Sequence, residues 1–297
     1  MSKLPARMLL AFAALFGISA ASAIELPAQA IAIEQLAHRL GQVPPMERHR
    51  QLVDAYRQAH PRSVRQESLA ELRAHFETAN VTVFYANDRE LAHELLALYR
   101  ALESSGSATP DDLDLTAQAL FKARAFDAAN ALLQAHPGKQ APVTLVRPQP
   151  VAAHAPAVMR VEADGQLSLH PADAAVLENG VVIIAHPLCH FSQAASAAIL
   201  ADPQLHDALR TALWLVPTEG NLHLGQIRDW NANHPEQAMQ LTYDWLAWDM
   251  IPGWSTPNFY FFHDGQLLTR VQGWPTDGSR KDELLAAVKT WQAASSH

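Results

Sequence analysis

The chain changes its residue pattern near residue 138, and this change constrains the fold more than any single motif. Residues 24–138 are rich in Ala, Leu, Glu, Gln and Arg, with apolar residues three and four positions apart, which predicts helices, among them 68–78 and 110–122. The following half instead contains short apolar runs typical of buried strands: Val181–Ala185, Leu213–Val216, Asn258–Phe262 and Gln266–Val271.

The segments between these strands have helical spacing, and a helix over 281–293 is expected to end the chain. The order β-α-β-α-β-β-α places a parallel pair of strands beside an antiparallel hairpin. The sequence therefore predicts an α/β domain with a central mixed sheet and helices on both faces. An all-α helical domain precedes it.

The first 23 residues have the features of an export signal. Lys3 and Arg7 form a basic start, Met8–Ser19 is an apolar stretch of about 12 residues, and Ala21-Ser22-Ala23 matches a cleavage site. The apolar stretch is shorter than the ~20 residues of a typical membrane span, although an uncleaved anchor is the alternative. We expect cleavage after Ala23, export to the periplasm, and no stable membrane span afterwards.

Four segments follow from these patterns: the signal peptide 1–23, a helical domain 24–138, a linker with a β-hairpin lead-in 139–174, and the α/β domain 175–297. Residues 120–137, at the end of the helical domain, weakly resemble the turn and second helix of a tetratricopeptide repeat. An irregular helical bundle is the alternative. An Asp164-Gly165 turn marks the hairpin.

Charge and cysteine content limit the classes of function. The formal charge is −8, and loss of Lys3 and Arg7 makes it −10, so the chain is a poor candidate for nucleic-acid binding. The single cysteine, Cys189, cannot form a disulfide within the chain. In an oxidising compartment it is either buried and inert or free for reactions with other molecules.

Several motifs in the second half occur in a recognisable order. His186-Pro-Leu-Cys-His-Phe-Ser192 follows the first strand and opens a helix, and Ser255-Thr256-Pro257 precedes an aromatic strand. Asp264-Gly265 and Gly273-Trp274 come later. Together these segments resemble the thioredoxin-like superfamily over about residues 175–293, with a C-x-x-S variant of its active-site motif.

The resemblance implies roles for particular residues. Cys189 would be the nucleophile, because free N–H groups and the helix dipole stabilise a thiolate at a helix N-terminus, and a protonated His190 would add to this. Pro257 would be a cis proline facing the sulfur, and Thr256 would offer backbone groups to a bound peptide. Trp254 is a further candidate for substrate contact.

This sequence departs from the family pattern at two positions. Ser192 stands at the position of the second, resolving cysteine, so release of a mixed disulfide requires an external thiol. Ser192 would instead donate a hydrogen bond to the sulfur of Cys189. Leu188 replaces the usual tryptophan before the first cysteine.

The segment from Leu222 to Trp254 is longer than a minimal domain of this kind requires. We expect helices over 226–231 and 235–245. The tryptophans of this segment would form either a lid near Cys189 or part of the hydrophobic packing against the sheet.

Two functions remain open at this point, with a third as an alternative. One is an exported monothiol protein that exchanges disulfides with thiol-containing proteins or small thiols, in the manner of an oxidoreductase or isomerase. The other is a binding, scaffold or chaperone-like module without turnover. A metal-handling protein is a third, weaker alternative, with His186, Cys189 and His190 as ligands assisted by His223 or His263. We expect no cofactor.

Overall fold

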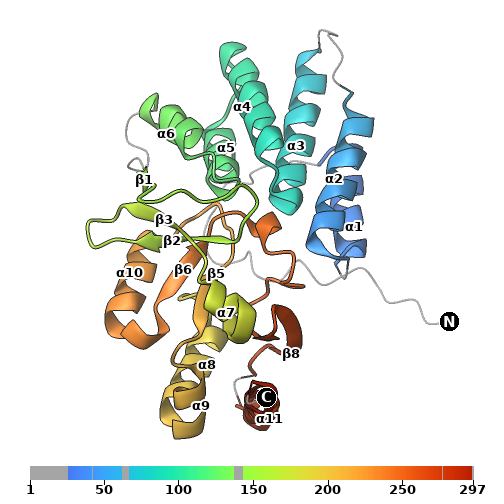
Figure 1. Cartoon of the computed structure of the whole chain (residues 1–297). Coiled ribbons are helices and arrows are strands. Elements are labelled where there is room, and N and C mark those ends of the chain that lie inside the picture. Colours follow the sequence, from blue (N-terminus) through green and yellow to red (C-terminus); the bar gives the residue numbers. More distant parts are fainter. Residues whose placement is uncertain (1–25, 42, 62–66, 137–142, 276, 296–297) are drawn as a thin grey trace, which may run out of the picture.

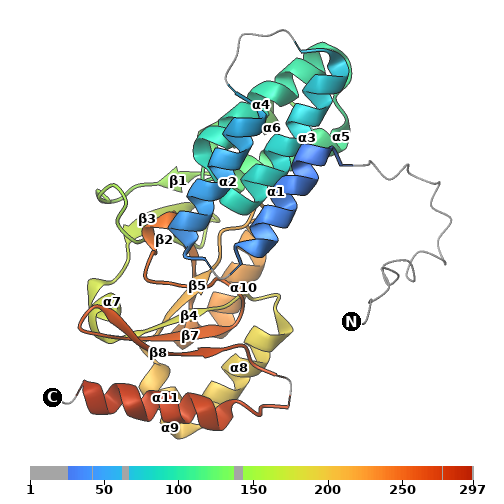
Figure 2. The ribbon, with the colours of Figure 1, turned by 90° about the vertical axis from the view of Figure 1, so that its right-hand side faces the viewer.

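The computed structural model describes residues 26–41, 43–61, 67–136, 143–275 and 277–295. The expected signal peptide lies outside this part of the chain. Helices α1–α6 form one body, and the sheet with helices α7–α11 forms another beside it (Figures 1 and 2). The chain is thus a mixed α/β protein with N-terminal helices, as the sequence pattern predicts.

The N-terminal helices begin where the sequence supplies helix-starting residues. Ser68 and Thr109 each form a reciprocal capping box with the acidic residue three positions later, and Pro45 and Pro110 occupy first helical positions. Successive helices pack against one another, α3 on α4, α4 on α5 and α5 on α6. The helices are α1 Ala28–Arg39, α2 Pro45–Ala59, α3 Leu69–Ala86, α4 Arg89–Ser104, α5 Pro110–Lys122 and α6 Phe126–Gln134.

The second body contains an eight-stranded mixed sheet in the order β1-β3-β2-β6-β5-β4-β7-β8. Strands β4, β5 and β6 are parallel, β7 pairs antiparallel with β4, and β8 pairs antiparallel with β7. The hairpin β2–β3, expected as a lead-in, extends the sheet by pairing with β6. The strands are β1 Leu145–Val146, β2 Ala157–Val161, β3 Leu167–Pro171, β4 Val181–Ile184, β5 Leu213–Val216, β6 Met239–Thr242, β7 Asn258–His263 and β8 Gln266–Gln272.

Alternate residues of the central strands enter two separate cores, because successive side chains of a strand point to opposite faces. Ile183 belongs to the larger core, which also includes Ile199 and Leu284 from helices α8 and α11. Its neighbour Ile184 belongs to the smaller core with Trp248. The helices of this body are α7 Ala174–Asn179, α8 His190–Ala201, α9 Pro203–Leu209, α10 Leu224–Asn233 and α11 Lys281–Ala294.

The prediction of a helix over 235–245 is wrong. Pro235–Gln237 and Trp245–Ala247 form short 3-10 turns, and the residues between them include strand β6. Met239 and Leu241 are buried, and β6 has a parallel neighbour on one side and an antiparallel neighbour on the other. Pairing on both edges decides this short segment, which has no strong preference of its own.

A buried arginine joins the helical body to the sheet. The guanidinium group of Arg124, just after α5, donates to the carbonyl oxygens of Thr242 and Tyr243 at the end of β6. It also donates to the carbonyl oxygen of Phe121. Gly220 lies against α5 so closely that a Cβ would be 2.7 Å from the carbonyl oxygen of Gln118. The two bodies are therefore in direct, closely packed contact.

Candidate functional site

Cys189 lies at the turn between strand β4 and helix α8. It is the N-cap residue of α8, and its backbone N–H donates to the carbonyl oxygen of His186 at 3.0 Å. The side chain is half-buried, and the thiol is free. A sulfur at this position faces the unpaired N–H groups of the first helical turn, which are the groups that stabilise a negative charge.

Ser192 and His186 fix the geometry of this turn. Ser192 is fully buried, and its Oγ accepts the backbone N–H of His186 at 3.3 Å. Its own hydroxyl proton is then available to the sulfur, with which Ser192 forms a hydrogen bond. Nδ1 of His186 accepts the backbone N–H of Leu188 at 3.1 Å. The turn is thus fixed from both sides of the cysteine.

The surroundings of Cys189 lower the pKa of its thiol. Burial alone would raise this pKa, because it disfavours the charged thiolate. Hydrogen bonds from the side chain of Thr256, from the backbone N–H and hydroxyl of Ser192, and from the backbone N–H of Phe191 outweigh that effect. Cys189 therefore has more thiolate character than a free cysteine, which is the property that makes a thiol reactive.

The segment containing Thr256 and Pro257 faces the cysteine. The peptide bond between them is cis, and Sγ of Cys189 lies 3.7 Å from the carbonyl oxygen of Thr256. An open groove of about 500 Å³ runs beside this segment, lined by Phe191, Ser255, Thr256, Pro257, Gln272, Gly273, Trp274, Pro275 and Arg280. The structure thus brings Cys189, Ser192, Thr256 and Pro257 together beside a groove.

Two candidate residues lie apart from this arrangement. His190 is exposed, and its ring contacts the ring of Phe191 at a centroid distance of 3.8 Å. Trp254 is not among the residues that line the groove beside Pro257. It lines a cavity of about 230 Å³ between the sheet and the N-terminal helices, with Arg48 and Lys122. The tryptophan at the groove is Trp274, whose position after strand β8 is the only signal of this role in the sequence.

The tryptophans of the segment 222–254 mainly fill cores. Trp230, Trp245 and Trp248 are buried, and the indole N–H of Trp230 donates to the carbonyl oxygen of Gln237. Trp230 also contributes to a second open groove, of about 540 Å³, which includes Pro187 and Leu188 on the other side of the cysteine. The segment therefore combines a packing role with one wall near the site.

The metal ligands proposed for this region do not assemble as expected. His186, Glu219 and His223 form a close group, and Cys189 is not part of it. Because Nδ1 of His186 accepts a backbone N–H, a neutral His186 carries its proton on Nε2, which lies 3.4 Å from Oε2 of Glu219. This nitrogen, which has no hydrogen-bond partner among the described residues, therefore carries a proton near a carboxylate and has no lone pair for a metal.

The neighbours of Glu219 lower the pKa of its carboxyl group. Burial alone would raise this pKa, but the close contact with His186 and the charges of His186, His223 and Lys122 lower it overall. His263, the other histidine considered, is bonded elsewhere, with Nδ1 2.9 Å from Oδ1 of Asn179.

Comparisons with family models, with curated proteins and with solved structures found no match to this chain. Within the residues that the structure describes, none of the helices combines the length and apolar character needed to cross a bilayer.

Proposed function

We propose that this chain is a thioredoxin-like monothiol protein of the periplasm that exchanges disulfides through Cys189. The arrangement β4-α8-β5, the hairpin β7–β8 and the final helix α11 agree with such a domain. The export signal expected in residues 1–23 supports the location. The observation that carries the proposal is the half-buried sulfur of Cys189 at the start of α8, held by hydrogen bonds that lower its pKa.

The reaction has two exchange steps. The thiolate of Cys189 attacks one sulfur of a disulfide, forms a mixed disulfide with it and releases the other sulfur as a thiolate. A thiolate from an external thiol then attacks the substrate sulfur of the mixed disulfide. It becomes disulfide-bonded to the substrate and releases Cys189 as the thiolate. The chain contains no second cysteine, so the second thiol has to come from another molecule.

The surface around the sulfur suits an extended polypeptide. Leu188, directly before Cys189, is 53% exposed, and Phe191, two residues after it, is 37% exposed. Trp274 also lines the groove beside Thr256 and Pro257. Exposed apolar side chains next to open grooves are typical of binding surfaces. We therefore propose exported thiol-containing proteins or peptides as the partners.

The thiol reaction can be tested with an aromatic disulfide reagent whose released thiolate absorbs visible light. We expect one mixed disulfide per folded chain, no reaction of Cys189→Ser, and a rate that titrates at a pH below that of a free thiol. Slow reaction of the folded protein, with fast reaction only after unfolding, would exclude the thiol-exchange proposal.

A second experiment tests the geometry of turnover. Ser192→Cys places a thiol at the position of a resolving cysteine, and we expect it to gain reduction of insulin disulfides in the presence of a small thiol. Ser196→Cys is the matched control, because Ser196 is buried one helical turn further along α8. Equal activity of the two variants would argue against the assigned position of Ser192.

A binding module without turnover is the second candidate function. The observation that favours it is Ser192 itself, because a buried serine that hydrogen-bonds the backbone of His186 stabilises the turn without any exchange chemistry. Such a module would bind peptides through the same grooves. It would bind them equally well in wild type and in Cys189→Ala, whereas the thiol protein would lose covalent capture in that variant.

A further inference from the structure

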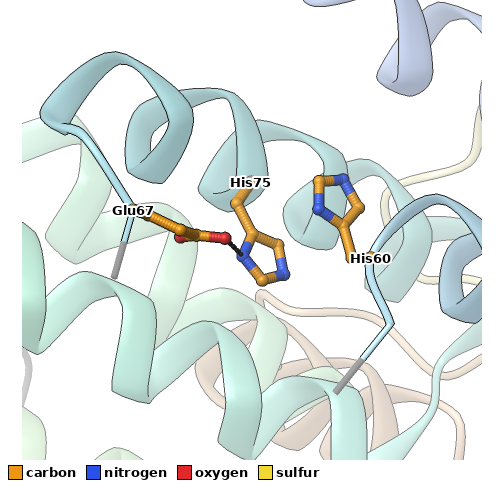
Figure 3. A group of neighbouring side chains, drawn as sticks. All are labelled: His60, Glu67 and His75. Atoms are coloured by element: carbon orange, nitrogen blue, oxygen red, sulfur yellow. Dashed lines mark hydrogen bonds and ion pairs between the residues drawn. The ribbon is translucent and has the colours of Figure 1, made fainter. Parts of the chain in front are cut away.

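A second group of potential ligands lies in the N-terminal helices, far along the chain from Cys189. His60 follows the end of α2, Glu67 precedes α3, and His75 lies on α3. Their side chains converge, with the ring of His75 between the carboxylate of Glu67 and the ring of His60 (Figure 3). One ligand atom from each residue lies within 4.8 Å of the others.

The hydrogen bonds of His75 leave one of its nitrogens directed at a carboxylate. Nε2 lies 2.8 Å from the hydroxyl oxygen of Tyr56, and that hydroxyl donates its proton to Oε1 of Glu94 at 2.6 Å. The oxygen of Tyr56 therefore accepts a hydrogen bond from the N–H at Nε2 of His75. Nδ1, which lies 2.9 Å from Oε1 of Glu67, is then the nitrogen that carries the lone pair in a neutral ring.

A lone pair and a carboxylate oxygen repel each other at this distance unless a positive group lies between them. A proton on Nδ1 is one such group, and a metal cation is the other. The hydrogen bonds from Nε2 of His75 to Tyr56, and from Tyr56 to Glu94, resemble the support of histidine ligands in metal sites. There the nitrogen that does not bind the metal donates to a carboxylate, carbonyl or water oxygen. Arg57 pairs with the other oxygen of Glu94 and completes this support.

His60 supplies a third ligand. Its Nε2 is shielded from solvent and has no hydrogen-bond partner in the described part of the chain. The ring stacks on that of His75, with centroids 4.1 Å apart and planes 4° from parallel, so binding requires the His60 ring to turn toward Nδ1 of His75.

We propose that His60, Glu67 and His75 bind a divalent transition-metal ion of the zinc type. Two imidazole nitrogens and one carboxylate oxygen form a donor set that suits zinc and its neighbours better than calcium or magnesium. Such ions bind at about 2.0–2.2 Å from nitrogen and oxygen ligands. The three side chains leave a coordination position for water. The ion would tie the end of α2 to the start of α3.

The test is a titration of the untagged full-length protein with Zn²⁺ in a calorimeter, and with Co²⁺ by visible absorption, at a pH near 7.5. We expect one ion per chain, with nitrogen–oxygen coordination in the Co²⁺ spectrum. His60→Ala and His75→Ala should each weaken Zn²⁺ binding by more than about 100-fold. Mutation of a residue that only hydrogen-bonds to a metal ligand already lowers metal affinity by about 10–100-fold. Glu67→Gln keeps the shape of the side chain and should also weaken binding, even if an alanine variant fails to fold.

Two histidine variants serve as controls. His93 is exposed on α4 and His223 belongs to the other group, so His93→Ala and His223→Ala should bind Zn²⁺ as wild type does. Absence of a bound ion in wild type would overturn the proposal. So would loss of binding in His223→Ala, or unchanged binding in Glu67→Gln and His75→Ala. Because none of these residues lies at Cys189, the outcome is independent of the thiol reaction.

Discussion

Replacing Ser192 by alanine tests the hydrogen bond on which the reactivity of Cys189 depends. The hydroxyl of Ser192 bonds the sulfur, and Ser192 is fully buried, so water does not replace the lost bond. A hydrogen bond to a charged group contributes about 1.5–3 kcal/mol. Sulfur is a weak acceptor, so the lower end applies, and about 1.4 kcal/mol corresponds to a tenfold change in the thiolate fraction.

The rate of disulfide exchange changes less than the thiolate fraction does. A more basic thiolate is a better nucleophile, with a Brønsted coefficient of about 0.4–0.5, so a tenfold change in basicity raises its intrinsic rate about threefold. Below the titration of the thiol, Ser192→Ala should therefore react about threefold more slowly than wild type. At high pH, where both proteins are fully ionised, it should react about threefold faster.

The two rate–pH profiles should therefore cross, which is the feature to measure with the aromatic disulfide reagent in a stopped-flow instrument. Ser196→Ala is the control, because it also removes a buried hydroxyl of α8, one that bonds Gln237 and not the sulfur. Its profile should match that of wild type. Profiles of Ser192→Ala and wild type that coincide, or that never cross, would refute the role assigned to this hydrogen bond.

Three further predictions concern stability in urea unfolding. The pKa of Cys189 in the folded protein is lowered from 9.0, so between the folded and unfolded pKa values the unfolded chain binds more protons. The stability of wild type relative to Cys189→Ser should therefore increase as pH rises through this window. This added stability should be lost as pH falls through the folded pKa. A pH-independent difference would contradict this. Arg124→Met should lower the free energy of unfolding by about 2–4 kcal/mol, because the carbonyl oxygens that accept hydrogen bonds from the buried guanidinium group lose their donors. A loss below about 1 kcal/mol would show that these hydrogen bonds contribute little to the contact between the two bodies. Gly220→Ala should lower the free energy of unfolding by about 1–3 kcal/mol, because the added Cβ would clash with the backbone of Gln118. Unchanged stability would contradict this close contact.

Local sequence patterns predicted the long helices and the central strands well. The helix Pro110–Lys122 and the strand Leu213–Val216 have the bounds that the sequence predicts. Their signals are local: a proline and early acidic residues at the helix start, and an apolar run in the strand. Such signals depend only on neighbouring residues, so they can be recognised without knowledge of the rest of the fold.

Helix α3 shows where local preference fails. The sequence indicates a helix ending near Thr78, but α3 continues to Ala86 through a β-branched stretch. Thr78 and Thr82 donate their hydroxyls to the carbonyl oxygens of Ala74 and Thr78, and this face is buried against α1 and α4. Burial of this face outweighs the low intrinsic helix propensity of these residues.

The candidate thiol site was predictable in part. Cys189 follows an apolar strand and precedes a helix, and this position marks it as the candidate thiol. Ser192 is separated from Cys189 by two residues, and this spacing marks it as the neighbour of the thiol. The sequence analysis did not assign Trp274 to the groove, and it did not place Trp254 in a cavity lined also by Arg48. Both depend on how strand β8 and the loop before β7 pack against other parts of the chain.

The sequence by itself determined the helical first half, the strand–helix order of the second half and the position of the single cysteine, because each follows from residue type and short-range spacing. Only the tertiary structure decided that Met239–Thr242 is a strand, that Arg124 joins the two bodies, and that His60, Glu67 and His75 converge. These features arise from contacts between residues distant in the chain. Local propensities are too weak to specify such contacts, and close packing selects among them.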